Sequence, residues 1–233
     1  MIRSGLDRPA DRHRTLEAHV EDPGWQPRRL AAVSAVLPDG VTPPGTRGKI
    51  LHAALGLFAE AGFAGGSIRG IAAVVGINSA TLYSHYPSKE HVLAELVRIG
   101  HQELLDRLAD ARAQAPDTPI GQLAAMARAH ALVHTDFPLL AVVTNDELHC
   151  LSTELAAPAL ELRRECRQML LDVLERGVKD GDFQLPDLLL TASAIGAIGL
   201  RTAYWFDPAQ DHTRDDVADA NTEFALRLAG ARR

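Results

Sequence analysis

The stretch SIRGIAAVVGINSATLYSHYPSKE, residues 67–90, decides the fold because it holds two short helical patterns separated by a turn. Apolar residues recur three and four positions apart from Ile68 to Val75, which predicts a helix with one apolar face. Ser67 stands at the position of an N-cap, and Gly76 stands where a helix end often needs a left-handed residue. Two short helices joined in this way are typical of a helix-turn-helix.

The second helix is short and unusually polar. Asn78 or Ser79 can cap it, and it should end near Tyr86 because Pro87 disfavours helical geometry in the residue before it. We expect Leu82 to pack against the first helix, since so short a helix is not stable alone. The other side chains are mostly hydroxyls, aromatic rings and an imidazole, which can reach phosphates, base edges and thymine methyl groups in a major groove.

These features predict a DNA-reading surface with a cation at each of the two flanking helix starts. Arg47 stands at the start of the preceding helix, and Lys89 stands at the start of the following one, where backbone N–H groups also attract phosphate. On pattern alone, a helical hairpin in an all-α core explains the segment equally well. The predicted DNA-contacting residues are Arg47, Ser67, Arg69, Asn78, Ser79, Ala80, Thr81, Tyr83, Ser84, His85, Tyr86 and Lys89.

Residues 46–96 resemble the DNA-binding domain of TetR-family regulators. Three segments carry the resemblance: the entry helix TRGKILHAALGLFAEAGF, the segment SIRGIAAVVGI and above all TLYSHYPSKEHVLAEL. The resemblance implies a three-helix helix-turn-helix domain at residues 46–92 in a transcriptional regulator that acts as a repressor. It also implies a homodimer that places two recognition helices in successive major grooves of a pseudo-palindromic double-stranded DNA operator. We expect Thr46 to cap the first helix and Gly62 to end it.

The composition of the 233-residue chain predicts a soluble all-α protein. The chain is 46% hydrophobic and 23% charged, and no useful length of it alternates with period two, as strands do. Residues 1–14 lack the apolar core of a signal peptide, and the most apolar charge-free stretch, residues 188–200, is too short to span a membrane. Cys150 and Cys166 lie far apart, which predicts neither a disulfide framework nor a zinc ribbon. We therefore expect a cytoplasmic protein with no membrane partner.

Charge is unevenly distributed along the chain. The whole chain carries −6, which by itself disfavours a nucleic-acid partner. Residues 46–90 hold four Lys or Arg and two Asp or Glu, a net charge of +2, whereas residues 91–233 hold 14 and 22, a net charge of −8. Because the acidic part is repelled by DNA, this asymmetry favours docking through the predicted helix-turn-helix.

An irregular extension and a helical body flank this domain. Residues 1–45 carry six prolines, which predicts an irregular segment. Arg28 and Arg29 can form a basic arm on DNA. The composition fits a tail without a structural role better than such an arm. Residues 93–233 are predicted to form a helical ligand-binding and dimerisation domain. After the helix-turn-helix domain, helices are expected at residues 88–114, 119–135, 139–151, 186–206 and 214–229. A further helix is expected to begin at residue 158 and to end between residues 177 and 181.

The body resembles, more weakly, the regulatory domains of TetR-family repressors of fatty-acid and sterol catabolism. The resemblance rests on NDELHCL, RRECRQMLLDVLERGVKDGDF and RTAYWFDP. It implies release from DNA by a small lipophilic effector, such as a fatty acyl or steroid acid thioester, and a subunit interface at residues 188–206, for which a buried monomer helix is the alternative. A coenzyme A head group needs clustered cations, which would come from Arg163, Arg164 or Arg167. The predicted effector-binding residues are Met126, Phe137, Asn145, His149, Arg201, Tyr204 and Trp205.

Residue spacing gives little support to enzymatic chemistry. His130 and His134 lie at i and i+4, as two metal ligands on one helix face do, but no third ligand is identifiable. Asp146 and Glu147 are adjacent, so they point to different faces of a helix and make a poor acid–base pair. We therefore predict no enzyme, no metal and no cofactor. Two alternatives stay open: a helical ligand-binding enzyme, and a partner-binding adaptor with a vestigial helix-turn-helix.

Overall fold

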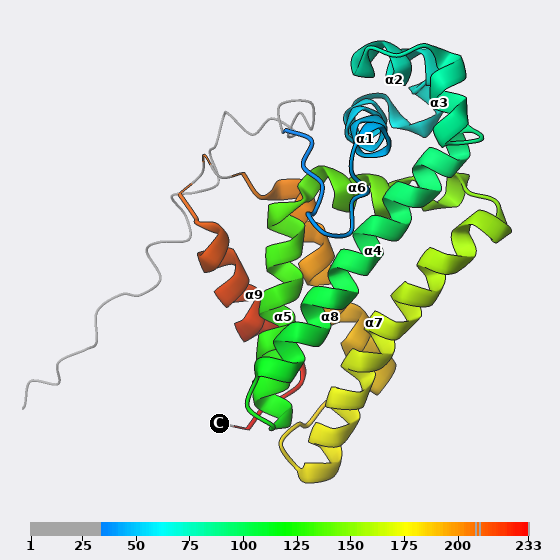
Figure 1. Cartoon of the computed structure of the whole chain (residues 1–233). Helices are drawn as coiled ribbons and strands as arrows, with labels where there is room; N and C mark the ends of the chain where they lie inside the picture. Colours follow the sequence, from blue (N-terminus) through cyan, green and yellow to red (C-terminus); the bar gives the residue numbers. More distant parts are fainter. Residues whose placement is uncertain (1–33, 208, 210, 233) are drawn as a thin grey trace, which may run out of the picture.

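A computed structural model of the chain describes residues 34–207, 209 and 211–232, and within these residues every regular element is a helix (Figure 1). This confirms the predicted all-α fold. Arg28 and Arg29 of the predicted basic arm lie outside the described residues. In chain order the elements are α1 (Thr46–Gly65), α2 (Ile68–Val75), α3 (Ser79–His85), α4 (Lys89–Gln114), α5 (Pro119–Asp136), α6 (Pro138–Asp146), the 3₁₀ helix η2 (Leu148–Cys150), α7 (Thr153–Asp180), α8 (Leu188–Trp205) and α9 (Arg214–Leu228).

Helices α1, α2 and α3 form a head at one end of the molecule (Figure 1). Ser67 caps α2, because its hydroxyl accepts a hydrogen bond from the N–H of Gly70 over 3.0 Å. Gly76 ends α2 with a φ of 78°, in the left-handed region that a side chain would disfavour. The predicted boundaries of this helix are confirmed.

Of the two predicted caps for α3, the structure uses Asn78. Its side chain accepts a hydrogen bond from the N–H of Thr81 over 2.8 Å, whereas Ser79 is the first helical residue. Leu82 is fully buried, as expected for the residue that holds so short a helix to its neighbours. Tyr86 follows the last residue of the helix in an extended conformation, directly before Pro87.

The predicted limits of α1 were wrong at both ends. Its N-cap is Gly45, with no side-chain cap, so Thr46 is the first helical residue and does not cap the helix. Gly62 has a φ of 70° and interrupts the helical geometry, but one further short turn continues to Gly65. The glycine at this position therefore produces a kink where the sequence predicted an end.

Two of the predicted body helices also differ from the structure. The helix expected at residues 139–151 is divided into α6 and η2, because Glu147, at φ −101° and ψ −1°, leaves the helical path between them. Helix α7 begins at Thr153, not at Pro158. Pro158 lies in the second turn, where its missing N–H removes one helical hydrogen bond without ending the helix.

The core of the head continues into the body. Helix α4 leaves the head and runs down the length of the bundle beside α5, while α6 lies beneath α1 (Figure 1). Leu139 and Val143 of α6 belong to the same buried cluster as Phe58 of α1 and Leu93 of α4. Leu37, from the segment before α1, is buried in this cluster as well. Helix α6 is thus a packed connection between the head and the body.

Helix α8 is long and apolar enough to cross a membrane by length and composition, with a mean hydropathy of 1.2 over 18 residues. A single helix of this kind is weak evidence, because core helices of soluble proteins pass the same test. In the body, α8 packs against α5, α6, α7 and α9 and buries Ala192, Ile195 and Ala203 along one side. Its other side is exposed, and the sequence pattern did not separate the two.

Candidate nucleic-acid interface and effector cavity

The exposed side of α3 carries most of the residues predicted to contact DNA. Tyr83 is 51% exposed, Ala80 and Ser84 are also exposed, and His85 is partly exposed. Arg69 on the neighbouring α2 is exposed beside them in the head. The helix therefore presents small side chains and one protruding aromatic ring, an arrangement that allows close approach to base edges.

Other predicted contact residues also hold the head together. Ser67 and Asn78 are the caps of α2 and α3, so their side-chain oxygens are already hydrogen-bonded. The Thr81 hydroxyl donates to Asn78 Oδ1 over 3.1 Å, and the Ser84 hydroxyl donates to the Thr81 carbonyl over 2.7 Å. Ser79 is half-buried. These side chains fix the shape of α3, and their contact with DNA stays a prediction.

Tyr86 was wrongly assigned to the exposed face. It is only 2% exposed and belongs to the core of the head, and burial raises the pKa of its phenol. The exposed Arg47 lies over its ring, with the guanidinium carbon 4.9 Å from the ring centroid. Arg47 is thus held at the head surface by a buried aromatic residue, which leaves its charge available to phosphate.

The ammonium group of Lys89 is bound within the head, and its predicted contact with phosphate stays a prediction. Its Nζ donates to the carbonyl oxygens of Phe63, over 2.6 Å, and Gly66, over 2.9 Å. The same nitrogen lies 4.1 Å from the centroid of the Phe63 ring. Lys89 therefore ties the start of α4 to the end of α1 and the residue that follows it, and two of its three N–H donors are used within the head.

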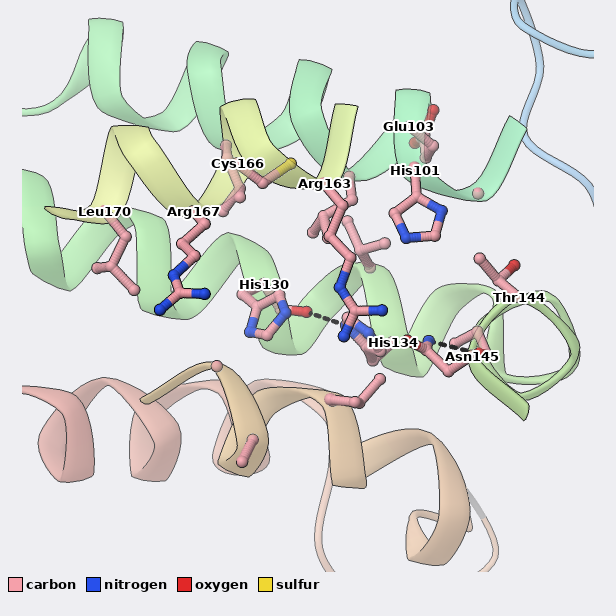
Figure 2. A pocket seen from close by; sticks show the side chains of 18 of the residues that line it. His101, Glu103, His130, His134, Thr144, Asn145, Arg163, Cys166, Arg167 and Leu170 are labelled. Carbon is pink, nitrogen blue, oxygen red and sulfur yellow. Dashed lines mark hydrogen bonds between the residues drawn. The ribbon is translucent and has the colours of Figure 1, made fainter. Parts of the chain in front are cut away.

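A cavity of about 610 Å³ lies in the body between α4, α5, α6, α7 and α8 (Figure 2). Its walls are mainly apolar, and its volume is in the range of sites for small molecules of drug size. Among the residues predicted to bind an effector, Met126, Phe137 and Asn145 line it.

The other four predicted effector residues lie outside this cavity. His149 is exposed on η2, where its Nδ1 is 2.7 Å from the Asp146 carbonyl. The Tyr204 hydroxyl donates to the Asp146 carboxylate over 2.6 Å, and the Arg201 guanidinium lies over the Tyr204 ring. Trp205 is 49% exposed. These residues were wrongly placed because the end of α8 bonds to the end of α6 on the outside of the bundle.

The predicted effector-binding residues did not include the polar groups at the inner end of the cavity. His101 of α4, His134 of α5 and Thr144 of α6 are buried side chains that line it. One signal was available, because His101 interrupts the apolar stripe of α4 and His130 and His134 interrupt that of α5. A histidine inside an apolar stripe can face a cavity as well as a metal.

Hydrogen bonds fix the tautomers of two of these histidines. His101 Nδ1 lies 2.9 Å from the Val97 carbonyl, and His134 Nδ1 lies 2.7 Å from the His130 carbonyl. Since a carbonyl only accepts, each Nδ1 carries the proton. Burial lowers the pKa of His101, and burial lowers the pKa of His134 to about 4. Both rings are therefore neutral near pH 7, and each Nε2 is a hydrogen-bond acceptor.

The outer side of the cavity is basic. Arg163, Arg164 and Arg167 reach it from α7, and all three are exposed. Figure 2 shows the Arg163 and Arg167 side chains extending from α7 toward the space above α5. Arg164 forms an ion pair with Glu161 of the same helix. An anionic group at this side of the cavity would meet two or three guanidinium groups.

The cavity lacks the groups of a nucleophilic or metal centre. Cys166 lines it, but burial raises the pKa of this thiol to about 12, so it is protonated and a poor nucleophile. Among the residues that the structure describes, no three His, Cys, Asp or Glu side chains are grouped to hold a metal ion. The arrangement is that of a binding site.

Comparisons with known proteins agree with both parts of the molecule. Residues 50–96 match the bacterial regulatory proteins of the tetR family, and residues 116–229 match the tetracyclin repressor-like C-terminal domain. The HTH-type transcriptional repressor KstR2 of Mycolicibacterium smegmatis is 35% identical over 152 residues, 63% of this chain and 71% of that protein. KstR2 of Rhodococcus jostii is 29% identical over 175 residues, 75% and 86% of the two chains. The solved structure of the ketosteroid transcriptional regulator KstR2 of Mycobacterium tuberculosis is 26% identical, with a TM-score of 0.74 over 82% of this chain and 98% of that one.

Proposed function

Because the chain belongs to the TetR family of bacterial transcriptional regulators, we propose that it is a cytoplasmic repressor. It would bind a pseudo-palindromic operator as a homodimer. A small lipophilic acid or its thioester would release it from the DNA. DNA binding through the helix-turn-helix and a regulatory, non-enzymatic role hold for the family as a whole. The single observation that carries the effector is the apolar cavity with arginines along one side.

The head supports a groove contact through α3. The exposed Tyr83 protrudes from this helix, and the exposed Arg47, Lys49 and Arg69 are cations available in the same part of the chain. The acidic body would be repelled by the phosphate backbone, so the duplex is expected to meet the head alone. Phosphate contacts of this kind make the affinity fall steeply with salt.

Exposed apolar side chains on α8 and α9 support a homodimer. Every fourth residue of α8 is exposed, from Leu189 to Trp205, and Leu190 next to this row is 71% exposed. On α9, Phe224 is 45% exposed and Leu228 is one helical turn further along. Apolar groups gathered on neighbouring helices are typical of a subunit interface.

The cavity supports a ligand with an apolar body and an anionic group. Its apolar walls would cover the body of the ligand, and Arg163 and Arg167 of α7 would pair with a carboxylate or phosphate. The name of one relative, a ketosteroid transcriptional regulator, is consistent with a ligand of this size and polarity. Helix α6 lines the cavity with Leu140 and packs toward the head with Leu139, so it supplies a route for coupling.

Fluorescence anisotropy with the DNA upstream of the protein's own gene tests the proposal. We expect the affinity to fall by about a hundredfold or more between 50 and 200 mM salt. A panel of fatty acids, acyl-coenzyme A esters, steroid acids and aromatic acids should contain a member that releases the DNA. An absence of binding, or binding that salt does not change, would contradict the DNA interface. Release only by a sugar or an amino acid would contradict the effector class.

A further inference from the structure

The inner end of the cavity offers three hydrogen-bond acceptors, on His101, His134 and Thr144. The Nε2 atoms of His101 and His134 are acceptors, because each Nδ1–H is bound to a backbone carbonyl. The Thr144 hydroxyl donates its only proton to the Leu140 carbonyl, which leaves its oxygen as an acceptor. These three groups come from α4, α5 and α6, and they lie on the side of the cavity nearest the head (Figures 1 and 2).

We propose that the effector carries a hydroxyl group on the end that it buries against His101, His134 and Thr144, with its anionic group toward the α7 arginines. This inference rests on the proposed function, since it specifies the ligand of the same cavity. A hydroxyl is the neutral oxygen group that donates a hydrogen bond to such acceptors. A ketone at this position brings a further acceptor against them, and a methyl group leaves all three without a partner.

Three other polar side chains of the cavity bear on the choice of ligand group. Glu103 is an acceptor and is already bound to the Arg107 guanidinium over 2.8 Å. Asn145 uses one N–H on the Ala141 carbonyl and has both an N–H and an oxygen left, so it accepts either kind of ligand group. Arg163 is a donor that extends from α7 toward His134 (Figure 2), and its charge contributes to the lowered pKa of His101. It is exposed on α7, so the anionic group of the ligand can occupy it.

The requirement for a hydroxyl makes discrimination between close analogues measurable. A site built to hydrogen-bond a substrate hydroxyl rejects the analogue that lacks it, because the buried polar groups of the site are then left unpaired. One neutral hydrogen bond of this kind corresponds to about a tenfold change in affinity. A hydroxyl has one proton to donate, so it pairs with one of these acceptors at a time, and its position on the ligand decides which one.

Two matched series of ligands test the inference on the full-length protein. The first is 3α-hydroxy-5β-cholanic acid, its 3-oxo analogue and unsubstituted 5β-cholanic acid, which differ only at the end remote from the carboxylate. The second is the ω-hydroxy and unsubstituted forms of decanoic, dodecanoic and hexadecanoic acids, each also as its coenzyme A ester. Dissociation constants are measured by calorimetry, and release of operator DNA is measured by anisotropy.

We expect the hydroxylated member of at least one series to bind about tenfold more tightly than its unsubstituted form and more tightly than the ketone. His134→Phe and Thr144→Val each remove an acceptor at nearly constant shape. Each variant should reduce this preference while the affinity for the unsubstituted ligand stays the same or rises. Thr144→Val keeps the test valid if His134→Phe fails to fold.

The outcomes separate this inference from the proposed function. The proposed hydroxyl group of the effector would be overturned by equal affinity for hydroxylated and unsubstituted ligands, or by a preference for the ketone. The proposal of a lipophilic effector would still stand if some member of the series released the DNA. A hydroxyl preference that survives both substitutions would also overturn it, since the hydroxyl would then be bound elsewhere. Binding by no member of either series would overturn the hydroxyl and the effector class together, and the DNA titration would still test the regulator.

Discussion

The Glu90 carboxylate accepts a hydrogen bond from the backbone N–H of Ser152, with 2.7 Å between Oε1 and N. Glu90 lies in the first turn of α4, directly after the head, and Ser152 is the N-cap of α7, which carries the arginines of the cavity. The pKa of Glu90 is lowered by its hydrogen bonds to Ser152, so the carboxylate is ionised at neutral pH. One side chain thus joins the start of α4, which follows the head, to the start of α7, which carries the arginines of the cavity.

Glu90→Ala should loosen this connection. We expect faster hydrogen exchange at the Ser152 amide, because its carboxylate acceptor is gone, and a smaller loss of DNA affinity on addition of effector. Nuclear magnetic resonance measures the exchange, and anisotropy measures the ratio of DNA dissociation constants with and without effector. Glu154→Ala, an exposed acid in the first turn of α7, is the matched control. Unchanged exchange at Ser152 in Glu90→Ala would show that the bond does not hold the α7 start in solution.

Lys89→Met should lower the stability of the head more than its general affinity for DNA. The substitution removes two hydrogen bonds from Nζ to backbone carbonyls but keeps an apolar chain near the Phe63 ring. Bonds from a partly exposed cation suggest a loss of about 1–2 kcal/mol in the free energy of unfolding. Chemical denaturation measures it, and the slope of affinity against salt reports phosphate contacts.

Lys49→Met is the matched control for Lys89→Met. Lys49 is exposed on α1, so its loss should leave the unfolding midpoint nearly unchanged. If Lys89→Met weakened DNA binding with a smaller salt slope and unfolded normally, its ammonium would be a phosphate contact and its bonds in the head would be secondary.

Tyr83 and Tyr86 provide a second matched pair, one exposed and the other buried. Tyr83→Ala should weaken binding to the operator by about 1–3 kcal/mol with little change in stability, as expected for a side chain that meets base edges. Tyr86→Ala should mainly destabilise the head, by about 3–5 kcal/mol for a large aromatic core residue. Competition with unrelated DNA separates specific from general affinity. Equal effects of Tyr83→Ala on operator and unrelated DNA would argue against base readout.

The contrast between Tyr83 and Tyr86 shows how far the sequence predicted the DNA interface. Apolar spacing, caps and turn residues located α2 and α3 correctly, because these signals act within a few residues. Whether an aromatic residue at the end of α3 faces solvent or the core depends on how α1 and α4 pack around it, and spacing within α3 does not show that packing. The bonds of Lys89 within the head were not predicted for the same reason, since its partners Phe63 and Gly66 lie at the end of α1 and directly after it.

The cavity was harder to predict, because five helices surround it. Met126 was predicted to line a pocket because it is an apolar residue on a predicted helix, and Phe137 because it is a large apolar residue at the break between two predicted helices. Tyr204 and Trp205 were misplaced because an aromatic cluster at a helix end suits a pocket and an exposed surface equally well. Only the packing of the helices decides between them.

Phe224→Asp should convert a dimer into monomers. A charge placed in an apolar interface is left without a partner, whereas Phe224 is 45% exposed in the single chain and its loss leaves the monomer core intact. Light scattering or sedimentation measures the mass. Val178→Asp is the control, since Val178 is exposed on α7 to a similar extent. Ala197, a small residue on α8, is a poorer test position because it also lines the cavity. A stable dimer in Phe224→Asp would place the interface away from this part of α9.

The neutral histidines of the cavity predict a loss of stability on mild acidification. The pKa of His134 is about 4 in the folded chain, against about 6.5 in an unfolded chain, so the unfolded state binds more protons between these values. Its contribution is complete above pH 6.5 and is lost as the pH falls toward 4, at up to about 1.4 kcal/mol per pH unit. Burial also lowers the pKa of His101 and His130, which adds to the slope in the same direction.

Urea denaturation at pH 7.5, 6 and 5 measures this slope, above the range in which most carboxylates titrate. His134→Phe removes one titrating group, so the variant should lose about 1 kcal/mol less than the wild type between pH 6 and pH 5. His52→Gln, at an exposed position on α1, should keep the wild-type slope. Parallel curves for wild type and His134→Phe would mean that His134 is protonated without cost in the folded protein. The Nε2 of His134 would then be a donor, and the inner end of the cavity would accept a ketone or carboxylate in place of a hydroxyl.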